Sequence, residues 1–413
     1  MHRLTLIVAA LLTTSSASSG DNWPQFLGPG GDADAGDVRV PLEWSETKNV
    51  VWKTPIPGRA WSSPVVWGGQ IWFTDATEDG REMYAVCLDK QTGVVLHRIL
   101  LFTPVEFQEI HALNSFASPT PVIEEGRVWV NFGTYGVACL DTATGEVLWK
   151  RTDINCDHFR GPGSSPILFE DLLIYPMDGI DVQYVIALNK TTGETVWKTP
   201  RSTDFRGLDG DFRKAYSTPT VIEVEGKPQL VSTGSEATIA YDPRTGEEIW
   251  KHRIAGFSNA ARPMYKGGRL LLNSGFTRAV LSAVQPTGRG DITETHVDWT
   301  FNSNVGIKSS AIVVNDLVYT AFDRGIVTCL ELDSAKPLWR ERLGGEFSAT
   351  PLHAAGRVYF FPHEGPATVI KAGRDFEVLA VNELDAGFMA SPAVTGNALI
   401  LRTEKAVYRI EEK

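Results

Sequence analysis

The chain has 413 residues, of which 43% are hydrophobic and 22% are charged, a composition typical of a folded globular protein. Its formal net charge of −11 argues against a nucleic-acid-binding role, because phosphate backbones require a basic surface, and it disfavours docking on anionic lipid. Glycine and proline recur at regular turn positions, which indicates a repeat architecture instead of disorder.

The first residues have the pattern of a secretory signal peptide. A basic start at His2-Arg3 precedes the apolar run 4–12, which is too short to span a bilayer. No cysteine lies near the expected cleavage point, so a lipid-anchored form is not expected. We therefore expect a signal peptide over residues 1–19 and a periplasmic or secreted protein without a membrane span.

Two short segments precede the repeats. Residues 20–48 form an N-terminal extension rich in Gly, Asp and Pro, and its Trp23, Phe26 and Trp44 predict packing across the body of the protein. Residues 49–58, NVVWKTPIPG, resemble the last strand of a repeat whose other strands are missing.

The rest of the chain repeats a unit of short strands separated by turn residues. The clearest copy is 117–150, in which runs of β-branched and aromatic residues predict a four-stranded antiparallel meander. With this copy there are eight in all, at spacings of 40 to 57 residues, each opened by an anchor residue: Pro64, Pro121, Pro166, Pro219, Pro263, Ala311, Pro351 and Pro392. The repetition predicts an all-β fold over residues 49–413, an eight-bladed β-propeller of four-stranded antiparallel blades.

A second signature is a Thr-Gly turn followed four residues later by a tryptophan. It occurs with Trp149, Trp197 and Trp250, while His97 occupies the same place in the first blade. Large rigid rings at one repeat position are typical of packing between neighbouring sheets, so we interpret these side chains as structural fillers.

The eighth copy, residues 390–410, supplies only three strands and lacks the Thr-Gly turn and the tryptophan. The isolated strand at 49–58 carries Trp52 and fits the missing place. Closure of the ring by this N-terminal strand would remove its last open edge, so we expect a monomer.

Repeats of the form S-P-x-V … G-x-V-Y … A-L-D-x-x-T-G-E-x-x-W resemble the quinoprotein-type, or PQQ-like, propeller repeat, and the similarity covers residues 49–413. Two groups share this propeller: the quinoprotein alcohol dehydrogenases, which use pyrroloquinoline quinone (PQQ) and calcium, and the outer-membrane assembly scaffold BamB with its non-catalytic relatives. PQQ and calcium are therefore the cofactors that a dehydrogenase interpretation implies. The catalytic members usually carry two adjacent cysteines beside the quinone, and no two cysteines are adjacent here.

The loops before the anchors are long and polar, and in a propeller of this kind they line one mouth of the central channel. Mixed charges and aromatic groups that converge on a funnel predict a ligand site. The candidate ligand-binding residues are His111, Asn114, Asp157, His158, Arg160, Asp211, Arg213, Tyr216, Arg262 and Lys308. The alternative is that they are ordinary loop residues that satisfy buried backbone groups. No metal is expected, because the three neighbours from Cys156 to His158 do not have the spacing of a metal site.

We therefore expect an exported, non-catalytic propeller that binds a small polar or anionic ligand, or an envelope protein, at the channel mouth, with no cofactor assigned. One alternative is a PQQ-dependent dehydrogenase in which Asp157 or Asp211 acts as the carboxylate base. The other is a BamB-like scaffold for envelope protein assembly. Motifs of serine hydrolases, zinc proteases and phosphate-binding loops do not occur in the sequence.

Overall fold

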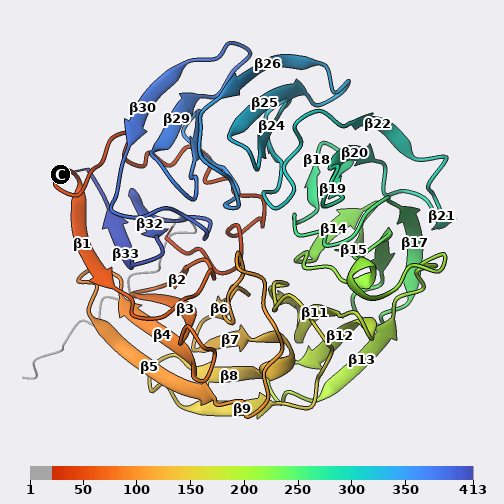
Figure 1. The fold of residues 1–413 in the computed structure, drawn as a ribbon, viewed down its shortest axis with the longest axis horizontal. Helices are drawn as coiled ribbons and strands as arrows, with labels where there is room; N and C mark the ends of the chain where they lie inside the picture. The colour runs from red at the N-terminus through yellow and green to blue at the C-terminus, as the bar shows by residue number, and fades with distance from the viewer. Residues whose placement is uncertain (1–20, 413) are drawn as a thin grey trace, which may run out of the picture.

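The computed structural model describes residues 21–412 as a closed ring of eight β-sheets around a central channel (Figure 1). The all-β, eight-bladed propeller predicted from the repeats is confirmed. The expected signal peptide, residues 1–19, lies outside the described residues. Within residues 21–412, no helix is long and apolar enough to cross a membrane.

The strands of each blade run in order from the channel to the rim (Figure 1). Blades 1 to 4 comprise β2 (Val65–Trp67), β3 (Gln70–Ala76), β4 (Met83–Asp89) and β5 (Val95–Phe102); β6 (Val122–Glu124), β7 (Arg127–Asn131), β8 (Val137–Asp141) and β9 (Val147–Arg151); β10 (Ile167–Phe169), β11 (Leu172–Asp178), β12 (Gln183–Asn189) and β13 (Thr195–Pro200); and β14 (Thr220–Val224), β15 (Lys227–Thr233), β16 (Ala237–Tyr241) and β17 (Glu248–Arg253).

Blades 5 to 8 follow the same order, and two short 3-10 helices lie in connecting segments. The remaining strands are β18 (Met264–Lys266), β19 (Arg269–Ser274), β20 (Val280–Val284), β21 (Gly290–Asp291) and β22 (Val297–Phe301); β23 (Ile312–Val314), β24 (Leu317–Phe322), β25 (Ile326–Glu331) and β26 (Pro337–Arg342); β27 (Leu352–Ala354), β28 (Arg357–Phe360), β29 (Ala367–Lys371) and β30 (Val378–Asn382); and β31 (Ala393–Thr395), β32 (Ala398–Arg402), β33 (Ala406–Ile410) and β1 (Val50–Pro55). The 3-10 helices are η1 (Gly133–Tyr135) and η2 (Gly210–Arg213).

In six of the eight blades, a bulky residue of the outer strand faces a small residue of the third strand. In blade 2, Trp149 is paired with Cys139, and the register shifts directly after this pair. The same pairing recurs as Cys87 with His97, Ala187 with Trp197, Ala240 with Trp250, Ala283 with Trp299 and Cys329 with Trp339. A small partner leaves room for the ring of the outer strand, which explains why cysteine or alanine occupies this repeat position.

The divergent stretch of blade 5 forms a link to blade 4. Strand β21 leaves blade 5 and pairs in parallel with β17, so that Trp250 lies opposite Gly290 and Lys251 opposite Asp291. The repeat pattern does not predict this pairing. The added strand covers the outer edge of blade 4, which would otherwise offer unpaired backbone groups.

The ring closes through its N-terminal strand, as predicted. Strand β1 pairs antiparallel with β33 and completes the sheet of blade 8. Its Trp52 then reaches blade 1, where the indole Nε1–H donates to the backbone oxygen of Lys90 at 3.1 Å. Thr54 donates to the backbone oxygen of Gly93 at 2.6 Å.

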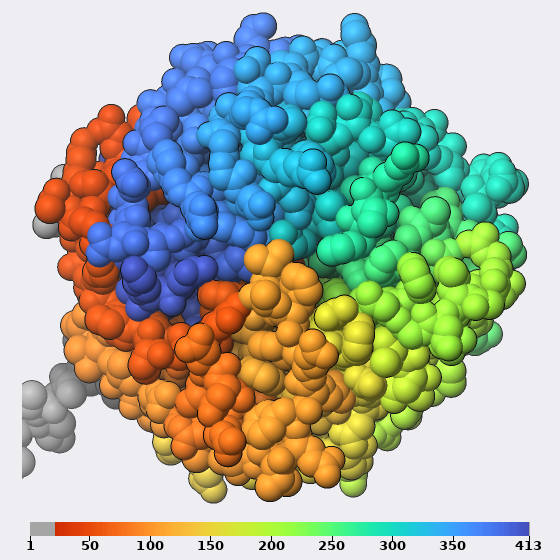
Figure 2. All heavy atoms as spheres, in the orientation of Figure 1, coloured from red at the N-terminus to blue at the C-terminus, as the bar shows by residue number. Residues whose placement is uncertain are grey.

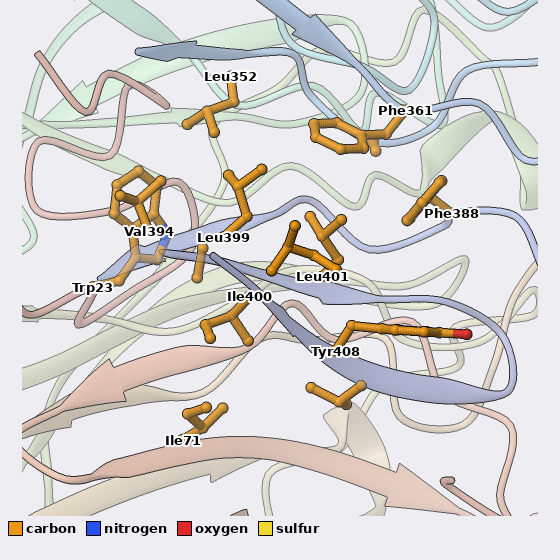
Figure 3. Packing of buried hydrophobic residues seen from close by; sticks show 14 of the residues in the cluster. Trp23, Ile71, Leu352, Phe361, Phe388, Val394, Leu399, Ile400, Leu401 and Tyr408 are labelled. Atoms are coloured by element: carbon orange, nitrogen blue, oxygen red, sulfur yellow. The ribbon is translucent and has the colours of Figure 1, made fainter. Parts of the chain in front are cut away.

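The N-terminal extension crosses the centre of the ring, where it is drawn in red in Figure 1. Its backbone pairs at Trp23 with Val66 of β2 and at Asp34 with His353 of β27. These partners lie in the inner strands, close to the turns that lead away from the predicted mouth, so the extension covers the opposite end of the channel. Trp23 belongs to the buried cluster of blades 7, 8 and 1 shown in Figure 3.

Candidate functional site

A belt of hydroxyl groups lines the channel, formed by the Ser or Thr residues that stand in front of seven of the eight anchors. At seven of the eight joints, the backbone N–H of the residue in front of one anchor donates to the side-chain oxygen of the residue in front of the next: Ser63 to Thr120 (2.9 Å), Thr120 to Ser165 (2.9 Å), Ser165 to Thr218 (3.0 Å), Arg262 to Ser310 (2.8 Å), Ser310 to Thr350 (3.2 Å), Thr350 to Ser391 (3.0 Å) and Ser391 to Ser63 (3.0 Å). Because each oxygen already accepts an N–H, the hydroxyl hydrogen remains available as a donor.

The belt is interrupted at blade 5, where Arg262 stands in front of the anchor. The residue is 2% exposed, its Nη1 donates to the backbone oxygen of Phe26 at 2.5 Å, and burial lowers its pKa to about 10. Gly31 of the extension packs against the guanidinium with φ 66°, and a Cβ there would lie 2.5 Å from Cζ. Arg262 therefore fixes the extension across the end of the channel.

A cavity of about 420 Å³ lies between this extension and the mouth loops. Phe26 of the extension contributes to its lining, together with five belt residues: Ser63, Thr120, Ser165, Thr218 and Ser391. Figure 2 shows one face of the ring, where orange and yellow atoms of the loops after blades 1 and 2 reach the centre. The cavity is thus a cup with a hydroxyl belt in its wall and the polar loops at its rim.

The structure brings six of the ten predicted site residues together in this cup: His111, Asn114, Arg160, Asp211, Tyr216 and Lys308. Asn114 orders the loops, because its Nδ2 donates to the backbone oxygens of Arg160 and Pro162 at 2.8 and 3.1 Å. His111 is exposed, and its Nδ1 accepts the backbone N–H of Leu113 at 3.1 Å.

His158 and Asp157 lie in the wall behind the cup and do not contribute to its lining. His158 is buried, its Nε2 accepts the backbone N–H of Thr134 at 3.1 Å, and burial lowers its pKa to about 4. The backbone N–H of His158 donates to Oε1 of Gln108 at 2.8 Å. Asp157 caps its own loop by accepting the N–H of Phe159 at 2.9 Å. Both residues hold the loop in place.

Arg213 and Arg262 also lie outside the lining of the cup. Arg213 stays within its own loop, where Nε donates to the backbone oxygen of Leu208 at 2.9 Å and the guanidinium stacks 5.4 Å from the ring centre of Phe205. Arg262 is directed towards the extension, as described above.

The charged groups of the cup include two internal ion pairs. Asp211 contacts Lys214, whose side chain is 3% exposed and also donates to Oγ of Ser258 at 2.9 Å. Lys308 lies 2.8 Å from Asp323. These two pairs are neutral in sum.

Arg160 adds a positive charge that is weakly compensated. Its described acidic partner is the exposed Glu109, at 4.0 Å, and its guanidinium stacks 4.3 Å from the ring centre of Phe159. The lining therefore carries a net positive charge near the Arg160 side of the mouth, although the whole chain is acidic.

Two further donors of the cup have no hydrogen-bond partner in the described part of the chain. They are the indole Nε1–H of Trp61 and the hydroxyl of Tyr216. Burial raises the pKa of Tyr216, so its hydroxyl stays protonated and remains a donor. Buried donors without partners are uncommon in folded proteins, and both of these atoms are enclosed by surrounding protein atoms.

Calcium would find a poor set of ligands here. Ca²⁺ takes six to eight oxygen ligands, several of them carboxylates. The two carboxylates that line the cup, Asp211 and Asp323, are each paired with a lysine. Within residues 21–412, no group of three or more His, Cys, Asp or Glu side chains is arranged to hold a metal ion. The residues present do not fit a calcium-bound quinone.

Several lining residues were not among the predicted candidates. Phe276 and Asp323 come from turns between the second and third strands of blades 5 and 6. Strands alternate in direction within a blade, so these turns lie at the same end of the ring as the loops before the anchors. The belt also has a signal in the sequence, since Ser or Thr stands in front of seven of the eight anchors. Phe26 is predicted to pack across the body of the protein, and the structure places it in the lining of the cup.

Comparison with known proteins shows that the fold is similar to those of BamB and of a quinohemoprotein alcohol dehydrogenase. The structure of BamB from Moraxella catarrhalis matches with a TM-score of 0.62 at 13% identity, over 88% of this chain and 97% of that chain. The quinohemoprotein alcohol dehydrogenase from Comamonas testosteroni matches with a TM-score of 0.71 at 12% identity, over 97% of this chain and 82% of that chain. At these identities the matches show the fold alone.

A curated relative, the tetrathionate hydrolase of Acidithiobacillus ferrooxidans, is 21% identical over 277 residues, which are 62% of this chain and 54% of the relative. The chain thus spans about half the length of that enzyme. The family described as outer membrane protein assembly factor BamB matches residues 36–153 and 278–386, together more than half of the chain. The protein therefore belongs to this BamB-type family of PQQ-like propellers.

Proposed function

We propose that the protein is an exported, non-catalytic propeller that binds a small ligand carrying an oxyanion in the cup at the channel mouth. The observation that carries the proposal is the concentration of donors. The belt hydroxyls offer hydrogens, and Arg160 supplies a positive charge. Hydrogen bonds to a charged acceptor are about twice as strong as those between neutral groups, so an oxyanion would gain most from this lining.

The tetrathionate relative and the quinoprotein fold both agree with this ligand class, because tetrathionate and PQQ are oxyanions. Calorimetric titration of the purified protein with sulfate, tetrathionate and PQQ tests the proposal. We expect saturable binding of at least one of these probes, and binding of PQQ with no requirement for calcium. Absence of binding by all three would contradict the proposal.

Substitutions in the lining of the cup test whether the oxyanion binds there. Arg160→Gln removes the weakly compensated charge and Thr218→Val removes one belt hydroxyl, so each should weaken binding by about tenfold. Arg213→Gln is the matched control, because it removes a guanidinium from a mouth loop that does not line the cup. Equal losses in Arg160→Gln and Arg213→Gln would show that the oxyanion binds elsewhere.

A scaffold for envelope protein assembly is the second candidate, and family membership favours it. In this function the ring presents its loops to an envelope protein. Affinity capture from envelope extract, with the free protein added as competitor, should return one specific partner. Capture that is unaffected by the competitor would count against a scaffold. A dehydrogenase is less favoured, because the carboxylates of the cup are engaged by lysines.

A further inference from the structure

We infer that the ligand of the cup is amphipathic, with a compact oxyanion head and an apolar body that rests on an aromatic wall at the mouth. The inference builds on the proposed oxyanion site and names the rest of the ligand. It is carried by three phenylalanines on one side of the mouth, by their exposure and by the position of the cationic groups beside them.

The three rings form a contiguous wall. Phe212 and Phe257 make an edge-to-face contact with ring centres 4.8 Å apart, and Phe257 lies 6.0 Å from Phe276. They come from the loop of η2, from the loop after β17 and from the turn between β19 and β20. Phe257 and Phe276 also line the cup, so the wall continues into the cavity.

Two glycines bring the separate segments together. A Cβ on Gly256 would lie 2.4 Å from the Cα of Gly275, and both residues have positive φ values, 132° and 90°. Only glycine permits this close approach of two backbones. Phe257 and Phe276 each follow one of these glycines, which places their rings side by side.

The wall is exposed although its rings are large. Phe212 and Phe276 are each 46% exposed, and so is Leu113 on the opposite loop of the cup. Exposed apolar side chains scattered over a surface need no explanation, but a group that borders a cavity marks a binding site. An apolar body laid across these side chains would remove them from water.

The polar head has a defined place beside the wall. Nζ of Lys214 lies 5.5 Å from the ring centre of Phe257, at the boundary between the aromatic wall and the charged part of the lining. Asp211 neutralises this ammonium, so Arg160 remains as the cation that attracts the head. The closed end and the volume of about 420 Å³ suit a small free molecule.

Octanoate, butyrate and n-octanol separate the contributions of head and body. We expect calorimetry to give an affinity for octanoate at least ~30-fold above that for butyrate, because the added methylenes are buried. We expect n-octanol to bind at least ~10-fold more weakly than octanoate, because it lacks the charge. Equal affinities of octanoate and butyrate, or of octanoate and n-octanol, would overturn the inference.

Phe212→Ser with Phe276→Ser should lower octanoate affinity about tenfold and lower butyrate affinity by a smaller factor, because butyrate has less apolar surface to bury. The matched control is Leu148→Ser with Val196→Ser, which removes two exposed apolar side chains from outer strands. A loss of the same size in the control would overturn the inference, as would sedimentation of the protein with phosphatidylglycerol vesicles, which would point to a lipid surface.

If sulfate, tetrathionate or PQQ binds in the cup but octanoate shows no advantage over butyrate, only the amphipathic ligand fails. If no anion binds, the oxyanion site fails as well.

Discussion

Trp149 packs directly against the backbone of Gly193 in the next blade. A Cβ at Gly193 would lie 2.7 Å from Cδ2 of the indole, and the indole Nε1–H donates to the backbone oxygen of Lys190 at 3.1 Å. The same contact joins Trp52 to Gly93 and Trp197 to Gly246. The tryptophan and the glycine of the repeat signature are therefore two halves of one joint between blades, and the joint rejects any side chain at the glycine.

Gly193→Ala should destabilise the protein by about 2–4 kcal/mol, because it adds backbone strain at φ 76° to a steric conflict with the indole. Gly226→Ala is the matched control, since its φ is 73° but nothing lies within 4 Å of the added Cβ. Urea unfolding followed by fluorescence should show a loss of only about 1 kcal/mol in the control. Similar losses in both variants would refute a steric joint.

Removal of a belt hydroxyl should destabilise the ring. Thr350→Val leaves the buried backbone N–H of Ser310 without its acceptor, at a cost of about 1–3 kcal/mol. Thr300→Val is the control, because Thr300 is exposed on the outer strand β22. Thermal unfolding should show a lower melting temperature for Thr350→Val alone. Two equal melting temperatures would mean that the belt contributes nothing measurable.

Deletion of residues 20–58 should lower the melting temperature sharply. It removes β1, which exposes the edge of β33, and it removes the extension that covers Arg262. An exposed strand edge also favours association between molecules, so the truncated chain should form oligomers. Calorimetry and light scattering measure both effects. A monomer that melts at the wild-type temperature would show that closure is unimportant.

The buried His158 should make stability depend on pH. Its folded pKa of about 4 lies below the value of about 6.5 expected for an unfolded chain, so the unfolded state binds more protons between these values. The stabilising contribution is complete above about pH 6.5 and is lost as pH falls towards 4. The full contribution is about 3 kcal/mol.

His158→Gln should therefore reduce the difference in unfolding free energy between pH 7 and pH 4.5, measured in urea. The exposed His111→Gln variant serves as the control and should follow the wild type. Burial also lowers the pKa of His363 to about 4, so part of the dependence will persist in His158→Gln. A pH profile of His158→Gln that coincides with the wild type would contradict a buried neutral imidazole.

The repeats were sufficient to predict the propeller because the sequence signals that define each blade lie within that blade. The anchors, the Thr-Gly turns and the tryptophans are separated by fixed distances within one blade, and strands that adjoin in sequence also pair in space. Trp52 even revealed the closure, because a single strand of the repeat had no other place in the ring. Strand β21 escaped prediction, since its partner belongs to another blade.

The candidate site was only partly predictable. The sequence predicted that His111, Arg160 and Tyr216 lie in the mouth loops, and the structure brings them to one cavity. The sequence also predicted His158 as a ligand-binding residue, but the fold buries this side chain. Which side of a loop faces the channel depends on packing against neighbouring blades, and no local pattern records it.

The sequence by itself determined the number of blades, their strand order and the closure of the ring, because these follow from short-range turns and repeated packing positions. Only the tertiary structure decided the cup. Phe26 forms the floor of the cup, and three separate segments form its aromatic wall. The hydroxyls of the belt belong to residues of successive blades. These groups meet because the ring closes, and closure is a property of the whole chain.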